Sequence, residues 1–202
     1  MDLNIGFTSE YLDSNDLRRL GFRQVGENVR ISRNSTLVGL ENIEIGNNVR
    51  IDSYVVILSK RGQTSIGSNV HIEPSCSIVS HFNVQIGNFC TLSHGVRLFT
   101  ASANYDGNFF TNVFPDAHFQ KPEEGQIVLE DHVIVGGNSV VMPNVVIREG
   151  AAIGALSFVK RSVEGWGIYG GNPLRFIRSR NQRIKKLGEE ILAESKYGLK
   201  ND

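Results

Sequence analysis

Aliphatic residues recur at intervals of six through most of this chain, and this period constrains its fold more than any other feature. A six-residue period with three steps to a turn is typical of the hexapeptide β-helix, in which each coil buries its aliphatic side chains on the coils above and below. The period therefore predicts an all-β solenoid whose outer surface and interrupting loops are available for chemistry. The positions in phase are Ile45, Ile51, Ile57, Ile66, Ile72, Ile78, Ile86, Leu92, Leu98, Leu129, Val135, Val141, Ile147, Ile153 and Val159.

Composition and charge exclude several classes of partner. Among the 202 residues, Lys+Arg and Asp+Glu both number 21, so the charge balance gives no reason to expect nucleic acid or a membrane surface as a partner. We expect neither a signal peptide nor a membrane-spanning segment, because no apolar run is long enough. Cys76 and Cys90 lie in coil segments, which predicts buried, reduced thiols in a cytoplasmic protein. The five histidines and two cysteines lack compact ligand spacing, so we predict no metal site.

The pattern divides the chain into three parts. They are an N-terminal helical segment over residues 1–24, a β-helix over 25–163 with an inserted loop over 102–126, and a tail with a C-terminal helix over 164–202. Capping residues such as Asp13 predict a short first helix from about residue 8 to 20. Apolar residues at helical spacing after Pro173 predict the second helix at about 175–196.

Three coils are longer than the rest, and their extra residues fall on the same side of the solenoid. A regular coil has 18 residues, as from Leu129 to Ile147, whereas the preceding spacings are 21 from Ile45 to Ile66, 20 from Ile66 to Ile86 and 43 from Ile86 to Leu129. Because equivalent positions on stacked coils lie roughly 4.8 Å apart, we expect these surpluses to share one corner. They comprise Lys60 and Arg61, His81 and Phe82, and the start of the long loop.

The long loop is unusually aromatic. Loops of this length in compact domains are usually functional or disordered, and aromatic side chains gain more from burial than from contact with water. We therefore expect the loop to form an arm that packs on a neighbouring subunit. Its aromatic residues are Tyr105, Phe109, Phe110, Phe114 and Phe119.

Several strings of residues in the second half of the chain resemble the hexapeptide-repeat acyltransferases, a left-handed parallel β-helix family that includes galactoside, maltose, serine and sugar-nucleotide acetyltransferases. The matching strings are VGGNSVVMPNV at 135–145, IGALSFVKR at 153–161 and WGIYGGNPLRFI at 166–177. The last is the most specific, because a Gly-Asn-Pro-x-Arg-x-Ile sequence that ends a hexapeptide domain is a strong signal. The resemblance covers residues 40–180.

The resemblance implies a homotrimer with acetyl-CoA in the groove between two β-helices. Gly136 and Gly137 would lie at a coil turn beside the thioester, where a main-chain N–H could stabilise the oxyanion of a tetrahedral intermediate. The other implied cofactor contacts are Gly137, Ala155 and Ser157 along the pantetheine, Lys160, Arg161 and Arg175 at the phosphates, and Pro173 against the adenine.

One expected catalytic residue is missing. O-acetyltransferases of this family usually carry a histidine at the opening of the long loop, and that position here holds Ala103. A hydroxyl acceptor needs a general base, whereas a neutral amine is already nucleophilic, so the absence favours N-acetylation of an amino sugar. His81 is the best replacement base, because it sits one coil earlier at the same corner, inside a two-residue bulge. His94 and His118 are weaker candidates.

The sequence therefore predicts an acetyl-CoA-dependent enzyme that N-acetylates a nucleotide-linked amino sugar in surface polysaccharide biosynthesis. O-acetylation of a saccharide hydroxyl is an alternative, with His81 or His118 as an obligatory base. A non-catalytic β-helix scaffold is another, although it would leave the string at 166–177 without a purpose. The residues that we expect to contact the acceptor are Lys60, Arg61, Asn83, Asn104, Tyr105, Asp106 and His118.

Overall fold

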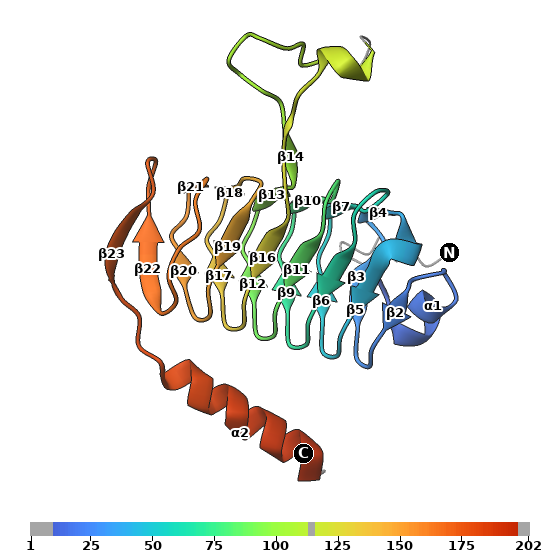
Figure 1. Ribbon diagram of the computed structural model, residues 1–202. Helices are drawn as coiled ribbons and strands as arrows, with labels where there is room; N and C mark the ends of the chain where they lie inside the picture. Colours follow the sequence, from blue (N-terminus) through green and yellow to red (C-terminus); the bar gives the residue numbers. More distant parts are fainter. Residues whose placement is uncertain (1–9, 113–115, 198–202) are drawn as a thin grey trace, which may run out of the picture.

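The computed structural model describes residues 10–112 and 116–197, and most of these residues form one long prism. Short strands stack coil upon coil, an arm rises from one edge of the prism, and helix α2 (Arg183–Tyr197) lies beyond the opposite edge (Figure 1). The predicted parallel β-helix is confirmed, because the strands of successive coils pair in parallel along three sheets. Within the described residues, no helix is both long and apolar enough to cross a membrane.

The three sheets are named here A, B and C, and each coil visits them in the order B, A, C. Sheet A contains β1 (Tyr11–Leu12), β3 (Arg30–Ser32), β6 (Arg50–Ile51), β9 (His71–Ile72), β12 (Thr91–Leu92), β17 (Ile134–Val135), β20 (Ala152–Ile153), β22 (Gly167–Gly170) and β23 (Arg175–Ser179). Sheet B contains β2 (Gln24–Val25), β5 (Ile43–Ile45), β8 (Thr64–Ile66), β11 (Val84–Ile86), β16 (Ile127–Leu129) and β19 (Val145–Ile147). Sheet C contains β4 (Thr36–Val38), β7 (Val56–Leu58), β10 (Ser77–Val79), β13 (Arg97–Phe99), β18 (Val140–Val141) and β21 (Phe158–Val159).

The core of the prism is the series of aliphatic residues that the six-residue period identifies. Ile51 pairs with Ile72 and Ile57 with Ile78 in register, and all four side chains are fully buried. Side chains of successive strand residues point to opposite faces, so each such strand turns its neighbouring residues outward. The stacking of these side chains makes the prism a rigid support for the residues at its corners.

The three surpluses meet at one corner, as the spacing predicts. This C–B corner, where the chain passes from sheet C to sheet B, holds Lys60 with Arg61, then His81 with Phe82, then the root of the arm. Parallel pairing of β7, β10 and β13 aligns the three turns, because Leu58, Val79 and Phe99 share one register position.

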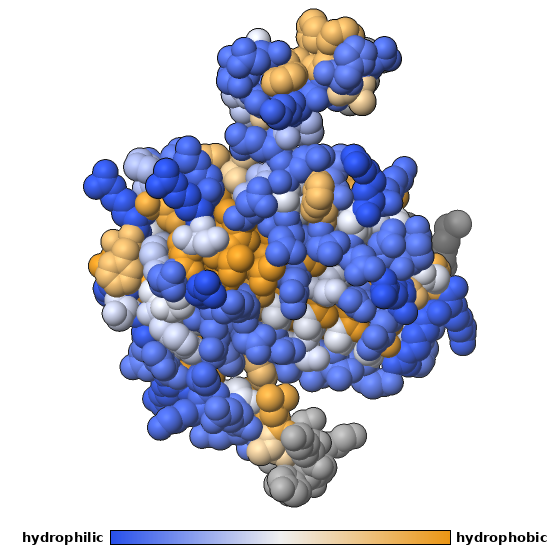
Figure 2. Space-filling model, viewed as in Figure 1, coloured by the Kyte–Doolittle hydropathy of each residue, from blue (hydrophilic) through white to orange (hydrophobic). Residues whose placement is uncertain are grey.

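The arm stands on a two-stranded antiparallel stalk formed by β14 (Ala101–Ser102) and β15 (Glu123–Glu124). Its outer part contains the 3-10 helix η2 (Ala117–Phe119), and the main-chain N–H of Phe110 donates to the carbonyl of Phe119. The side chain of Tyr105 is 87% exposed and that of Phe110 is 61% exposed, and apolar side chains gather at the tip of the arm (Figure 2). Phe114 lies outside the described residues.

Both terminal helices differ from the prediction. The first, α1, covers only Ser14–Arg18, because strand β1 precedes it and Asp13 caps it with hydrogen bonds from two main-chain N–H groups. A second 3-10 turn, η1 (Leu40–Asn42), lies between β4 and β5. The segment 175–179, which was predicted to open the second helix, instead forms β23 on the edge strand β22. Pairing along that open edge outweighs the local helical spacing.

The tail is anchored to the B–A corner, where the chain passes from sheet B to sheet A. The guanidinium of Arg180 donates to the carbonyls of His132 at 2.8 Å and Gly150 at 2.9 Å. Helix α2 then crosses this corner at Gly188, where an added Cβ would lie 2.9 Å from the ring of His132. Helix α2 therefore lies at the edge of the prism opposite the arm (Figure 1).

Candidate active site

The C–B corner carries a cavity of about 370 Å³ with an apolar floor and a cationic rim. Outward-facing side chains of β4, β7 and β10 make the floor: Val38, Leu58 and Val79 occupy one register position on three successive coils. Lys60, Arg61 and His81 line the rim. The cavity therefore offers apolar contact to a ring system and positive charge to a phosphate.

Hydroxyl groups buried under this corner hold its bulges in place. The side chain of Thr64 bridges the hydroxyls of Ser59 at 2.5 Å and Ser80 at 2.6 Å. The hydroxyl of Thr100 accepts hydrogen bonds from the main-chain N–H groups of both His81 and Phe82. These buried hydroxyls provide hydrogen-bond partners for the irregular main chain of the inserted residues. The exposed imidazole of His81 is therefore attached to a main chain that is held in place.

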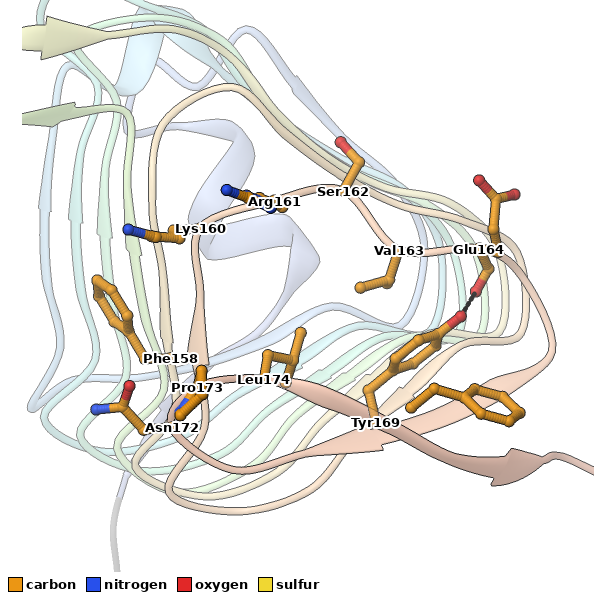
Figure 3. A pocket seen from close by; sticks show the side chains of 11 residues that line it. Phe158, Lys160, Arg161, Ser162, Val163, Glu164, Tyr169, Asn172, Pro173 and Leu174 are labelled. Atoms are coloured by element: carbon orange, nitrogen blue, oxygen red, sulfur yellow. Dashed lines mark hydrogen bonds between the residues drawn. The ribbon is translucent and has the colours of Figure 1, made fainter.

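A larger cavity, of about 630 Å³, opens at the C-terminal end of the prism. Figure 3 shows Lys160 and Arg161 on one wall, with Asn172 and Pro173 near the sheet edge below them. Tyr169 lies across from the lysine and donates its hydroxyl to the carbonyl of Glu164 at 3.1 Å. Three predicted cofactor contacts, Lys160, Arg161 and Pro173, therefore share one cavity that suits a phosphate-bearing ligand. Arg175 does not line it and lies exposed on β23.

The two predicted oxyanion donors are not equivalent. The N–H of Gly136 donates to the carbonyl of Ile153 at 2.7 Å, so this group is already satisfied within the solenoid. Gly136 is a glycine for steric reasons, because an added Cβ would lie 2.5 Å from the main-chain nitrogen of Ala155. The N–H of Gly137 has no hydrogen-bond partner in the described part of the chain. The assignment of Gly136 as a donor is corrected, and Gly137 remains the candidate.

The two small residues predicted to line the pantetheine differ from each other in their exposure to solvent. Ala155 is exposed beside Gly137, at the turn from sheet A to sheet C, which we call the A–C corner. Ser157 is buried: its hydroxyl donates to the carbonyl of Gly154 at 2.6 Å and accepts from the N–H of Gly171. Ser157 therefore supports the turn from inside and cannot line a surface groove.

The remaining predicted acceptor contacts line neither of these two cavities. Asn104, Tyr105, Asp106 and His118 are on the arm, away from the prism of their own chain (Figure 1). The carboxylate of Asp106 accepts the N–H of Asn108 at 2.8 Å, and this hydrogen bond holds its pKa below the usual value. The amide oxygen of Asn83 accepts the N–H of Gln63, so that side chain ties two coils together.

The candidate base and the candidate oxyanion donor lie at different corners. His81 belongs to the C–B corner and Gly137 to the A–C corner, so a strand of sheet C separates them. About six residues of extended chain span that sheet, which corresponds to a separation on the order of 15–20 Å. One protomer therefore cannot bring the two groups to a single reacting carbonyl.

The two buried cysteines are not suited to act as nucleophiles in acyl transfer. Burial raises the pKa of Cys76 to about 11 and that of Cys90 to about 12, so both are protonated near neutrality and poor nucleophiles. No group of three or more His, Cys, Asp or Glu side chains suited to a metal ion occurs within residues 10–112 and 116–197.

The prism thus carries two cavities with cationic side chains that suit phosphate-bearing ligands. Comparison with known proteins agrees. The chain is 36% identical over 188 residues to the dTDP-4-amino-4,6-dideoxy-D-glucose acyltransferase of Escherichia coli, covering 93% of this chain and 97% of that protein. No model of a protein family matches the sequence. The chain belongs to the hexapeptide-repeat sugar acyltransferases, so the predicted family and enzyme class are confirmed.

Solved structures of N-acyltransferases match nearly the whole chain. The N-acyltransferase AntD of Bacillus cereus, in complex with dTDP and 3-hydroxybutyryl-CoA, is 32% identical with a TM-score of 0.88, covering 94% of this chain and 100% of that chain. A variant of the same protein in complex with dTDP-4-amino-4,6-dideoxyglucose and coenzyme A is 31% identical with a TM-score of 0.85, covering 93% and 100%. A maltose O-acetyltransferase of Clostridium difficile shares the fold at 20% identity and a TM-score of 0.56.

Sequence reasoning missed the apolar floor at the C–B corner and the aromatic lining of the end cavity. The signal for the floor was present, because Leu58 and Val79 directly follow core positions Ile57 and Ile78 and must therefore face outward. The end cavity carried no such signal. Phe158, Tyr169 and Phe176 come together only because the solenoid ends there and β23 folds back on β22.

Proposed function

We propose that this protein transfers an acyl group from acyl-CoA to the amine of a dTDP-linked amino sugar. The observation that carries the proposal is the full-length similarity to an acyltransferase named for dTDP-4-amino-4,6-dideoxy-D-glucose, together with AntD complexes that contain dTDP and coenzyme A. The cavity at the C–B corner suits such an acceptor, because its apolar floor fits a base and Lys60 and Arg61 fit a diphosphate.

In the reaction, the nitrogen lone pair of the acceptor attacks the thioester carbonyl. The N–H of Gly137 stabilises the oxyanion that forms. The carbon–sulfur bond then breaks as the C=O bond is restored, and the nitrogen loses its surplus proton. His81 accepts that proton and the departing thiolate of coenzyme A is finally protonated, so the products are an amide and free coenzyme A.

The separation of His81 from Gly137 supports a homotrimer with shared sites. A cyclic trimer repeats one interface three times, and each interface joins different surfaces of the two neighbours. Such an arrangement sets the A–C corner of one protomer against the C–B corner of the next. The exposed aromatic side chains of the arm then have a neighbouring prism to pack on.

We further propose that the acylated sugar enters a surface polysaccharide and that the reaction takes place in the cytoplasm. The nature of the acceptor supports the first point, because sugars are activated as nucleotide derivatives before transfer to a growing chain. The two unpaired cysteines support the second, because they suit a reducing compartment.

A coupled assay of coenzyme A release tests the proposal. The acceptor panel contains dTDP-4-amino-4,6-dideoxyglucose, UDP-linked amino sugars and plain saccharides, and the donor panel contains acetyl-CoA and 3-hydroxybutyryl-CoA. We expect turnover with the dTDP-linked amine and an amide product by mass spectrometry. Turnover only with hydroxyl acceptors would replace the proposal by O-acylation.

A further inference from the structure

The outer surface of sheet A carries a row of residues at equivalent positions on successive coils, directly beside the A–C corner. Each main-chain N–H in the row donates to a carbonyl of the following coil, which fixes the alignment. The donors and acceptors are Asp52 to Ile72 at 3.0 Å, Glu73 to Leu92 at 2.9 Å, Ser93 to Val135 at 2.9 Å and Gly136 to Ile153 at 2.7 Å. Neighbouring members of the row are therefore one coil apart, roughly 4.8 Å.

The row changes along the prism from glycines to residues with polar side chains. Gly154 and Gly136 present no side chains: the main chain of the next coil fills the place of a Cβ at Gly136, whereas at Gly154 the nearest atom would be 3.4 Å away. Toward the N-terminus, the row continues with the side chains of Ser93 and Glu73. Glu73 lies two coils from Gly136, about 10 Å away along the axis. Its side chain spans part of that distance, so a group bound to its carboxylate lies within reach of a carbonyl beside Gly137.

The two acidic residues of the row differ in what they can bind. Both carboxylate oxygens of Asp52 are engaged: Tyr11 and Arg50 donate to one, and His71 lies 2.7 Å from the other. Glu73 is half-buried, and its Oε2 accepts the main-chain N–H of His94 at 3.0 Å. Its Oε1 has no hydrogen-bond partner among the residues that the structure describes. Glu73 is thus held by one oxygen and offers the other to a donor.

We propose that Glu73 binds the acceptor in its ammonium form, which releases one proton to solvent before the freed lone pair attacks, and that this contact makes the enzyme selective for an amine over a hydroxyl. This inference rests on the proposed function and assigns the amine-recognising group of the same site. A carboxylate forms a stronger hydrogen bond with a charged donor than with a neutral one, so the side chain favours an amino sugar over its hydroxyl counterpart. The diphosphate then lies on the cationic rim of the neighbouring protomer, and the acceptor bridges the interface.

The test measures selectivity by binding, so that it does not depend on turnover. Dissociation constants are measured by calorimetry for dTDP-4-amino-4,6-dideoxyglucose and for the dTDP-sugar with a 4-hydroxyl group, using the full chain. The wild type should prefer the amine by about tenfold or more, as expected for a hydrogen bond to a charged group. Glu73→Gln should bring the two constants within about twofold, and Glu73→Asp should retain part of the preference.

Glu44→Gln is the matched control. Glu44 is also half-buried and also accepts a hydrogen bond from a neighbouring coil, from the hydroxyl of Ser65 at 2.5 Å, but it lies on sheet B. This variant should keep the wild-type preference, and all variants should bind coenzyme A equally. A preference for the amine that survives Glu73→Gln, or that the wild type lacks, overturns the inference. Absence of acylation by the wild type instead overturns the proposed function, because the binding ratio is measured separately.

Discussion

The main-chain N–H of His81 donates a hydrogen bond of 2.8 Å to the hydroxyl of Thr100, which is fully buried beneath the C–B corner. The same oxygen accepts the N–H of Phe82 at 3.0 Å, and the hydroxyl donates to the carbonyl of Val79 at 2.9 Å. One side chain on the coil that carries the arm therefore fixes the bulge on the coil before it. The position of the candidate base depends on this internal contact.

Thr100→Val should lower both stability and turnover. Valine keeps the shape but leaves the N–H groups of His81 and Phe82 without their acceptor, which costs about 1–3 kcal/mol for each buried donor. We expect the melting temperature to fall by roughly 4 °C or more and kcat to fall with it. Thr100→Ser retains the oxygen and should keep most of both. Scanning calorimetry and initial rates measure the two effects, and equal behaviour of the two variants would argue against the role of the hydroxyl.

His81→Ala should reduce kcat for the amino sugar by about a hundredfold, in the range expected for loss of a general base. The side chain is exposed, so the melting temperature should not change. His94→Ala tests the weaker candidate at the A–C corner, where the side chain is also exposed, and should cost much less activity than His81→Ala. A loss of less than about tenfold would remove His81 from the mechanism.

Replacing Lys160 and Arg161 together by alanine should raise KM for acyl-CoA by about tenfold or more, since we expect each to donate a charge-assisted hydrogen bond to a phosphate of the donor. The KM for the acceptor should stay constant. A double variant of Arg19 and Arg30 removes the same charge from exposed positions far from the end cavity and serves as the control. Steady-state kinetics at two ionic strengths complete the measurement, because salt should weaken acyl-CoA binding in the wild type and have less effect in the double variant.

Asp52→Asn should destabilise the protein in a pH-dependent way. Burial raises the pKa of Asp52, but hydrogen bonds from Tyr11, Arg50 and His71 outweigh it and leave the pKa below its usual value. A lowered pKa stabilises the fold above the unfolded pKa of about 3.9, and this stabilisation is lost as the pH falls through the folded value.

The melting temperature of Asp52→Asn should therefore lie below that of the wild type between pH 6 and 8. The gap should close below about pH 4. Thermal scans of both proteins across this range check the prediction, and a gap that is constant down to pH 2 would contradict it.

The sequence predicts the prism well because a six-residue period leaves one choice of buried face. The same repeat also predicts that the inserted residues share one corner. Ile45, Ile66 and Ile86 are 21 and 20 residues apart instead of 18, and the extra residues fall on the same side of each coil. The sequence also contained the information that would have placed Ser157 inside, because it precedes the core residue Val159 by two positions.

Other features depend on contacts that no local pattern encodes. The N–H of Gly136 donates a hydrogen bond to Ile153 because the coil of Ile153 stacks on the coil of Gly136. The sequence motif contains both Gly136 and Gly137 and does not show which of the two N–H groups is already bonded. The strand at 175–179 forms because β22 presents an open edge, although the same residues have helical spacing. Both are consequences of tertiary pairing, which outweighs local preference.

A mixed-oligomer assay tests most directly whether the site is shared between protomers. His81→Ala disables the C–B corner, and Ala155→Trp fills the exposed A–C corner. Each variant alone should retain about 1% of wild-type activity or less. When the two are unfolded together, refolded as random trimers and verified by native mass spectrometry, about a quarter of the interfaces combine an intact corner from each chain. We predict recovery of about a quarter of wild-type activity; mixed trimers that remain inactive would contradict the shared site.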